Sequence, residues 1–326
     1  MAKICTKAIE KIARVIASAP ESAPLNFYSV SGKDGKEIVL DKMYPALDHA
    51  HAVEFFFFAI MNDYGFWYGD VAGYHAPLFG TMGSKSLKGS DLLWRSCMIA
   101  LGKDAEIFSA KHLANITPKE LAEVFSDDNG PIPWPDFEER FIMARSYGEW
   151  FLRNNSDPAW ILECVNARPD PLKLFLIMTK AIPGYDRDKS FVKKNILLAM
   201  ALSNRPERFL KVRADADWPA IVDYHLMRLA LRTGMVELDP QEATFIKERA
   251  WVSAIIEHEI RYHTKIAIEV LVRASGKNMS QVDFLCWSAR RYCPETEAPK
   301  CTDCVFKSAC AKRTELFQPV LRTSSY

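Results

Sequence analysis

The sequence lacks the long apolar segments that hold a chain in a membrane. Its most apolar run, FFFFAIM at 55–61, is far shorter than the roughly 20 residues that cross a bilayer. The first twenty residues carry Lys3, Lys7, Lys11 and Arg14 at helical spacing, and they lack the continuous apolar core of a signal peptide. We therefore expect a cytoplasmic protein with no membrane partner, and no obligate protein partner is evident.

The chain also lacks a net charge of either sign. Its 42 Lys and Arg residues face 41 Asp and Glu residues, which gives a formal charge of +1. Bulk electrostatic attraction to nucleic acid is therefore not expected, since such attraction comes from cations that neutralise phosphates. Local basic patches remain compatible with this balance, because net charge says nothing about distribution.

Internal repeats and low-complexity linkers are absent as well, and apolar positions recur mostly at helical spacing. We expect a mainly helical (all-α) fold in three parts: residues 1–44 with a helix and a small hairpin, a helical body at 45–291, and a cysteine loop and tail at 292–326. The hairpin is expected at 25–42. Helices are predicted at 1–18, 86–102, 108–115, 117–126, 135–155, 157–166, 171–181, 188–203, 219–234, 241–274 and 279–291.

Cysteine, by contrast, is plentiful, and four of the eight cysteines are closely spaced. Cys293, Cys301, Cys304 and Cys310 follow the pattern C-x7-C-x2-C-x5-C. Four thiolates within eighteen residues suit an iron–sulfur cluster or a zinc ion. A zinc knuckle is the alternative to a cluster, and a disulfide framework is less favoured because short paired spacing in a reduced protein indicates metal.

The stretch around these cysteines, RYCPETEAPKCTDCVFKSACAKR, resembles the iron–sulfur loop of helix-hairpin-helix DNA glycosylases such as endonuclease III and the adenine glycosylases. Those proteins usually have six residues in the first gap, where this chain has seven. The resemblance implies a [4Fe–4S] cluster with a structural role, held by the four cysteines. It also implies a two-lobed helix-hairpin-helix glycosylase-like fold.

A second segment, DWPAIVDYHLMRLALRTGM at 217–235, places Asp223 in an apolar frame, with Trp218-Pro219 predicted to open the helix. A carboxylate among apolar side chains is costly unless it is paired or used. An aspartate in such a position ordinarily caps a helix or forms a salt bridge. The run resembles the WP-x-x-x-VD-x-H-x-x-R stretch of endonuclease III relatives, one residue shorter, and this resemblance implies that Asp223 is the catalytic aspartate, with His225 and Arg228 at matching positions.

The glycine-rich hairpin of those glycosylases is altered here. The nearest match is IPGYDRDKSFVKKNILLAMAL at 182–202, where Asp186 or Arg187 replaces the second glycine. An acidic residue there would repel phosphate. Lys189, Lys193 and Lys194 are candidates for a nucleophilic lysine, although a solvated basic face is the more ordinary interpretation of such a run.

Three further segments resemble the queuosine salvage proteins, helical queuosine 5′-phosphate N-glycosylases of the same superfamily. They are GPIPWPDFEERFIMARSYGEWF at 130–151, VDYHLMRLALRTGMVEL at 222–238 and EHEIRYHTKIAIEVL at 257–271. In this chain His225 replaces the arginine of that family, its Pro-Gln pair is absent, and that family generally lacks a cysteine cluster. The resemblance implies hydrolysis of an N-glycosidic bond in a queuosine-like nucleotide or nucleoside.

Such a reaction needs a carboxylate near the anomeric carbon and a platform for the leaving base. Asp223 is the catalytic candidate, and the FFFF run at 55–58 is expected to pack in the core rather than to stack on substrate. The substrate-binding candidates are Tyr224, His225, Phe66, Trp67, Asp63 and Arg261.

The favoured interpretation is therefore an N-glycosidase acting on a modified purine (7-deazaguanine) nucleotide or nucleoside. One alternative is an iron–sulfur DNA glycosylase that excises a damaged base in DNA repair. Another is a non-catalytic nucleic-acid-binding module on the same scaffold.

Overall fold

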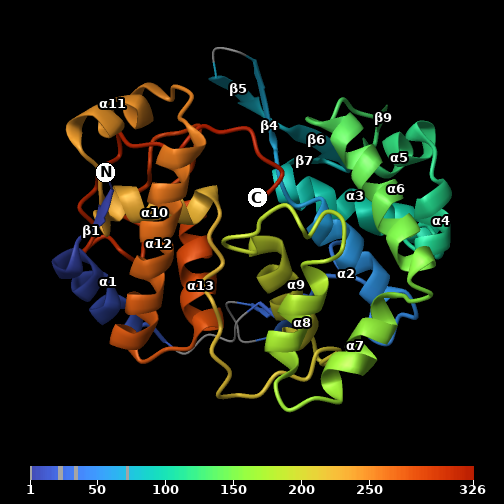
Figure 1. Cartoon of the computed structure of the whole chain (residues 1–326). Helices are drawn as coiled ribbons and strands as arrows, with labels where there is room; N and C mark the ends of the chain where they lie inside the picture. Colours follow the sequence, from blue (N-terminus) through green and yellow to red (C-terminus); the bar gives the residue numbers. More distant parts are fainter. Residues whose placement is uncertain (1, 21–24, 33–35, 71–72) are drawn as a thin grey trace. The chain divides into compact units, whose positions relative to one another are not determined.

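The computed structural model describes residues 2–20, 25–32, 36–70 and 73–326. This part of the chain contains 13 α-helices and short strands that pair into five two-stranded sheets (Figure 1). The prediction of a mainly helical protein is confirmed. Contacts group the chain into two compact units, of which the first comprises 1–24, 69–74 and 218–322 and the second 25–68, 75–217 and 323–326.

The first unit joins the N-terminal segment to the C-terminal third of the chain. Helix α1 buries Ile9, Ile12 and Ile16 and packs against α12. Strands β1 and β10 pair antiparallel, with Lys3 opposite Glu237. The elements are β1 (Lys3–Ile4), α1 (Thr6–Ser18), α10 (Tyr224–Thr233), β10 (Val236–Glu237), α11 (Pro240–Glu248), α12 (Ala254–Ser275), α13 (Met279–Ser288) and a 3₁₀ turn (Ala289–Arg291).

The second unit contains eight of the helices and most of the short strands. Strands β4 (Trp67–Asp70) and β5 (Gly73–Pro77) carry the chain between the two units. The other elements are β2 (Ser29–Ser31), β3 (Glu37–Val39), α2 (Ala52–Met61), β6 (Phe79–Met82), β7 (Lys85–Lys88), α3 (Gly89–Lys103), α4 (Ala110–Asn115), α5 (Pro118–Val124), β8 (Ser126–Asp127), β9 (Gly130–Pro131), α6 (Phe137–Arg153), α7 (Pro158–Asn166), α8 (Pro171–Thr179) and α9 (Lys193–Asn204).

The four consecutive phenylalanines at 55–58 lie in α2, and all four are fully buried. The ring of Phe58 stacks on Phe108 with centroids 4.4 Å apart, and the ring of Phe57 meets Tyr185 edge-on. A helix that is apolar on every side must be covered on every side. The expectation that this run packs in the core is confirmed.

Helices α4 and α6 cross at very short distance. A Cβ atom on Gly148 of α6 would lie 2.3 Å from the backbone nitrogen of Ala114 and 2.6 Å from the carbonyl oxygen of Ala110. Only glycine fits at such an approach, because a methyl group would overlap backbone atoms that cannot move aside.

Three buried cations close the C-terminal end of α2. The Lys194 ammonium donates to the Met61 carbonyl at 2.7 Å, and the Arg140 guanidinium donates to the carbonyls of Asn62 (2.6 Å) and Tyr64. Lys193 pairs with the Asp63 carboxylate at 2.5 Å. Cations stabilise this end of a helix because its last carbonyls carry partial negative charge.

This arrangement corrects the interpretation of the lysine run at 189–194 as a solvated basic face. Lys193 and Lys194 are buried, and only Lys189 is exposed. Burial lowers the pKa of Lys194 well below its ordinary value, and the nearby Lys193 and Arg140 lower it further. The two buried lysines bind groups at the C-terminal end of α2, and the sequence pattern alone did not indicate this.

Most predicted helices are present, although those predicted from 1 and from 188 begin at Thr6 and Lys193, and two others differ further. The helix predicted at 219–234 begins only at Tyr224, so Trp218-Pro219 does not open it. The helix predicted at 241–274 is two helices, because Arg249 adopts a left-handed conformation (φ 55°) that ends α11. The hairpin predicted at 25–42 is present as β2 and β3; its turn residues 33–35 lie outside the described residues.

The two contact-based units differ from the predicted division into 1–44, 45–291 and 292–326, because α1 and the cysteine loop belong to the same unit. Among the described residues, no helix is both long enough and apolar enough to cross a membrane.

Candidate functional site

Asp223 is the N-cap of α10. Its Oδ1 accepts a hydrogen bond from the backbone nitrogen of Leu226 at 2.9 Å, and the side chain is half-buried. The capping role that a lone aspartate commonly has is therefore present. A carboxylate has two oxygens and about four lone-pair sites, so a cap bond to Oδ1 is compatible with chemistry at Asp223.

The backbone just before Asp223 is held by α12. Arg261 is buried, and its Nε donates to the carbonyl oxygen of Val222 at 3.0 Å. Arg261 thus fixes the residue that precedes the candidate carboxylate. Substrate binding by Arg261 stays a prediction, and its contact with the Val222 carbonyl shows that it also holds the backbone beside Asp223.

Tyr224 and His225 begin α10 directly after Asp223. Their rings lie 4.2 Å apart, and both side chains are half-buried. The Nδ1 of His225 lies 2.9 Å from the Nη2 of Arg228. Since an arginine can only donate, this nitrogen of His225 accepts, which places any ring proton on Nε2.

Arg228 connects α10 to the cysteine loop. Its buried guanidinium donates to the Gln318 side chain (2.8 Å), to the Cys293 carbonyl (3.3 Å) and to the Glu295 carboxylate (3.3 Å). Burial lowers the pKa of Arg228, while the charge of Glu295 opposes that shift. A buried pair of this kind is strongly destabilised when one partner is removed.

The four spaced cysteines surround one small cavity in the first unit. Cys293, Cys301, Cys304 and Cys310 all line it, next to Leu229 and Phe306 among others. Burial raises the pKa of the Cys304 and Cys310 thiols, and the neighbouring thiols of the same set raise it further. Such neighbours disfavour thiolates unless a positive centre lies among them.

Two N–H groups point at sulfur atoms of this set. The Nη1 of Arg232 donates to the Cys293 sulfur at 3.2 Å, and the backbone nitrogen of Lys312 donates to the Cys310 sulfur at 3.3 Å. Hydrogen bonds of this type stabilise thiolates and tune metal-bound sulfur. In the described part of the chain, no three His, Cys, Asp or Glu side chains are arranged to hold a metal ion.

The remaining candidates belong to the second unit. Asp63 follows α2 and is bound by Lys193, Phe66 is buried against Trp134 (centroids 6.2 Å apart), and Trp67 is buried at the start of β4. The structure thus brings together Asp223, Tyr224, His225 and Arg261 in one unit. It places Asp63, Phe66 and Trp67 in the other.

Arg232 and Glu295 are the residues of this region that the sequence analysis missed. Both are buried polar residues that bind the cysteine loop to α10. The spacing of Arg228 and Arg232, four residues apart in the apolar run LMRLALRT, was the available signal. Residues four apart share one helix face, so both arginines reach the same segment.

Comparison with known proteins adds no family to this description. The chain matches no protein-family model, and it shows no significant match to any curated protein.

Proposed function

We propose that the protein is an N-glycosidase of the helix-hairpin-helix superfamily that hydrolyses the N-glycosidic bond of a queuosine-like, 7-deazaguanine nucleotide or nucleoside. Asp223 is the catalytic carboxylate. The observation that carries the proposal is the position of Asp223: half-buried, at the start of α10, with its backbone held by Arg261 and with Tyr224 and His225 beside it.

The chemistry follows from this position. Breaking the bond between sugar and base develops positive charge on the sugar, and a fixed carboxylate stabilises that charge or directs a water molecule to it. The bond from the Leu226 nitrogen orients Asp223, so little reorganisation is needed during the reaction. Tyr224 offers an aromatic surface for the base, and His225 offers a polar group for it.

We also propose that the four cysteines hold a [4Fe–4S] cluster, with zinc as the alternative occupant. The support is a common cavity lined by all four cysteines, together with the N–H groups directed at the sulfurs of Cys293 and Cys310. Four cysteine thiolates are the ligand set that such a cluster takes. A bound cluster would cross-link the loop, and Arg228 and Arg232, which bind the loop to α10, would transmit this order to the helix.

The test is base release by the anaerobically purified protein. Queuosine 5′-phosphate is offered beside DNA duplexes that carry damaged bases, and free base is quantified chromatographically. Asp223→Asn preserves the cap, because asparagine caps helices as well as aspartate, and it should lower the rate by several orders of magnitude. Asp157→Asn is the matched control, because Asp157 caps α7 through the Trp160 nitrogen at 2.7 Å.

Release of queuine by wild type and by Asp157→Asn, but not by Asp223→Asn, would support the proposal. Release only from DNA would move the protein to the repair alternative. Unchanged turnover in a folded Asp223→Asn variant would overturn the assignment of Asp223.

A further inference from the structure

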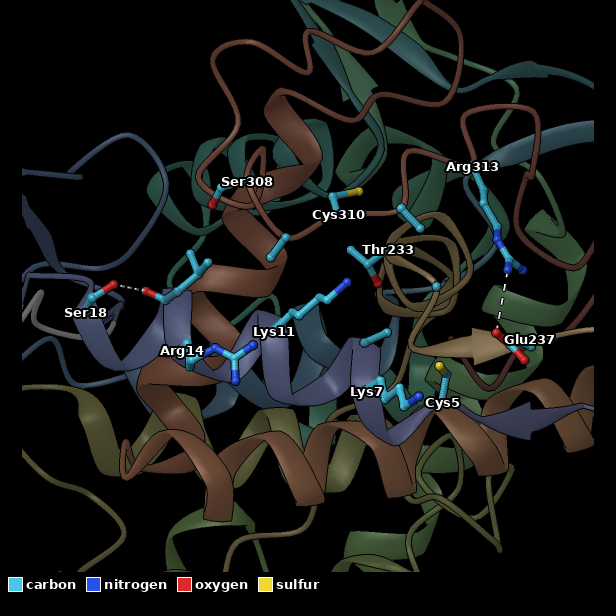
Figure 2. A pocket seen from close by; sticks show the side chains of 15 residues that line it. Cys5, Lys7, Lys11, Arg14, Ser18, Thr233, Glu237, Ser308, Cys310 and Arg313 are labelled. Atoms are coloured by element: carbon cyan, nitrogen blue, oxygen red, sulfur yellow. Dashed lines mark hydrogen bonds and ion pairs between the residues drawn. The ribbon is translucent and has the colours of Figure 1, made fainter.

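A basic groove runs between α1 and the cysteine loop in the first unit. It encloses about 690 Å³ and is lined by residues of α1, by the C-terminal end of α10 and by the loop at 308–313. Figure 2 shows Lys11 projecting from α1 into this space, with Ser308 and Cys310 on the loop side.

The cations of the groove form a row. Lys7, Lys11 and Arg14 are spaced i, i+4 and i+7, so they share one face of α1 and span about 10 Å. All three are exposed, and none of their side chains has a hydrogen bond or ion pair with another described residue. Arg313 adds a fourth cation from the loop side.

Negative charge in the groove is already compensated. Its single carboxylate, Glu237, lies 3.6 Å from the Lys3 ammonium and 3.7 Å from the Arg313 guanidinium. Glu10, the acidic residue of α1, does not line the groove. The cations on α1 therefore create a positive field that no described residue of the groove cancels.

The lining also limits which anion fits. An acidic protein would need large apolar anchors at the centre of its interface, and this groove offers only Val15 and alanines. A small phosphorylated ligand would need an enclosing apolar pocket, whereas the groove is open and polar. An extended chain of phosphates needs neither, since phosphate contacts are made by lysine and arginine side chains, hydroxyls and backbone N–H groups.

We propose that this groove binds the sugar–phosphate backbone of a nucleic acid without reading its sequence. Thr233 and Gly234, which line the groove, end the same helix that Asp223 begins, and α10 is about 15 Å long. The consequence for catalysis, which rests on the proposed function, is that the protein also accepts the modified nucleotide within a polynucleotide.

The experiment measures binding separately from turnover. Full-length Asp223→Asn protein is titrated onto fluorescent single-stranded RNA and DNA of mixed sequence, by anisotropy, between 50 and roughly 300 mM salt. A polyglutamate peptide of similar length is the non-nucleic polyanion. Three phosphate contacts predict a slope of log K against log salt of about −2 for single strands.

The triple variant Lys7→Gln, Lys11→Gln, Arg14→Gln leaves the buried face of α1 intact. It should bind at least tenfold more weakly at low salt, with most of the salt dependence lost. The matched control neutralises three exposed lysines of the other unit, Lys103, Lys111 and Lys119; it should bind as the parent protein does.

Equal binding by the triple variant and the control would overturn the proposal, as would equal affinity for polyglutamate or no binding at 50 mM salt. Each of these outcomes leaves the base-release assay unaffected. Conversely, backbone binding without base release would retain the groove and reject the proposed function.

Discussion

The Nη1 of Arg232 lies 3.2 Å from the sulfur of Cys293. The same side chain donates to the carbonyls of Leu316 (2.7 Å) and Pro294 (3.0 Å), so a single buried guanidinium binds three points of the C-terminal segment to α10. Arg228, one turn earlier, repeats this with Cys293, Glu295 and Gln318. The order of the cysteine loop and the order of α10 are therefore coupled.

Replacing Arg232 should loosen this coupling. Arg232→Gln leaves two carbonyls and one sulfur without their charged donor, and we expect a loss of about 1.5–3 kcal/mol in the free energy of unfolding. Iron content per chain should fall in the same variant. Arg213→Gln is the control, because Arg213 is exposed and its ion pair is with the exposed Asp215. Unaltered iron content and thermal midpoint in Arg232→Gln would contradict the coupling.

The reactivity of the cysteine thiols should show whether the four loop cysteines hold the proposed cluster. In the iron-loaded protein, a thiol reagent should label Cys5 and Cys164 but not the four loop cysteines, and chelation of iron should expose those four. Cys97 and Cys286 should react only after denaturation, because both are buried and burial raises the pKa of each thiol. Labelling of the loop cysteines in the loaded protein at the rate of Cys5 would argue against their role as ligands.

Arg261 should affect catalysis through Asp223. In Arg261→Gln the carbonyl of Val222 loses its donor, and a small displacement of the carboxylate should lower kcat by roughly 10- to 100-fold with little change in KM. Arg273→Gln lies on the same helix at an exposed position and should leave kcat unchanged. A rise in KM with constant kcat would instead support the substrate-binding role predicted from the sequence.

Gly148 should tolerate no side chain. In Gly148→Ala the added methyl would meet the backbone of α4, and we expect about 1–3 kcal/mol of destabilisation in chemical denaturation. Gly102→Ala tests the opposite case, because Gly102 of α3 has open space around it and alanine favours helix by up to about 1 kcal/mol. Equal midpoints for the two variants would show that the α4–α6 crossing relaxes.

The elements that the sequence predicted well carry strong local signals. The capping box of Thr117 and Glu120 is formed at α5, and Pro158 stands in the first turn of α7 behind its cap Asp157. The burial of the phenylalanine run at 55–58 follows from its composition alone. In each case a few adjacent residues determine the outcome.

The features that could not be predicted depend on distant partners. The apolar residues before Asp223 suggested a helix from Pro219, but the side chain of Asp223 caps a later start. Lys193 and Lys194 suggested a solvated face, yet their partners lie more than 100 residues earlier, at Asp63 and Met61. The role of Arg232 could not be predicted from its neighbours in the sequence, because its partner Cys293 lies in another segment.

The first unit is formed by segments far apart in the sequence, and this constrains how the protein folds during synthesis. Its residues come from the first 24 and from 218–322, with a short piece at 69–74. On the ribosome, α1 lacks its partner α12 until about 250 further residues have been synthesised. Residues 75–217 of the second unit are contiguous, so they can fold as they emerge. The four loop cysteines, at 293–310, follow α12 in the chain. Any cluster is therefore inserted only after α12, the partner of α1, has been synthesised.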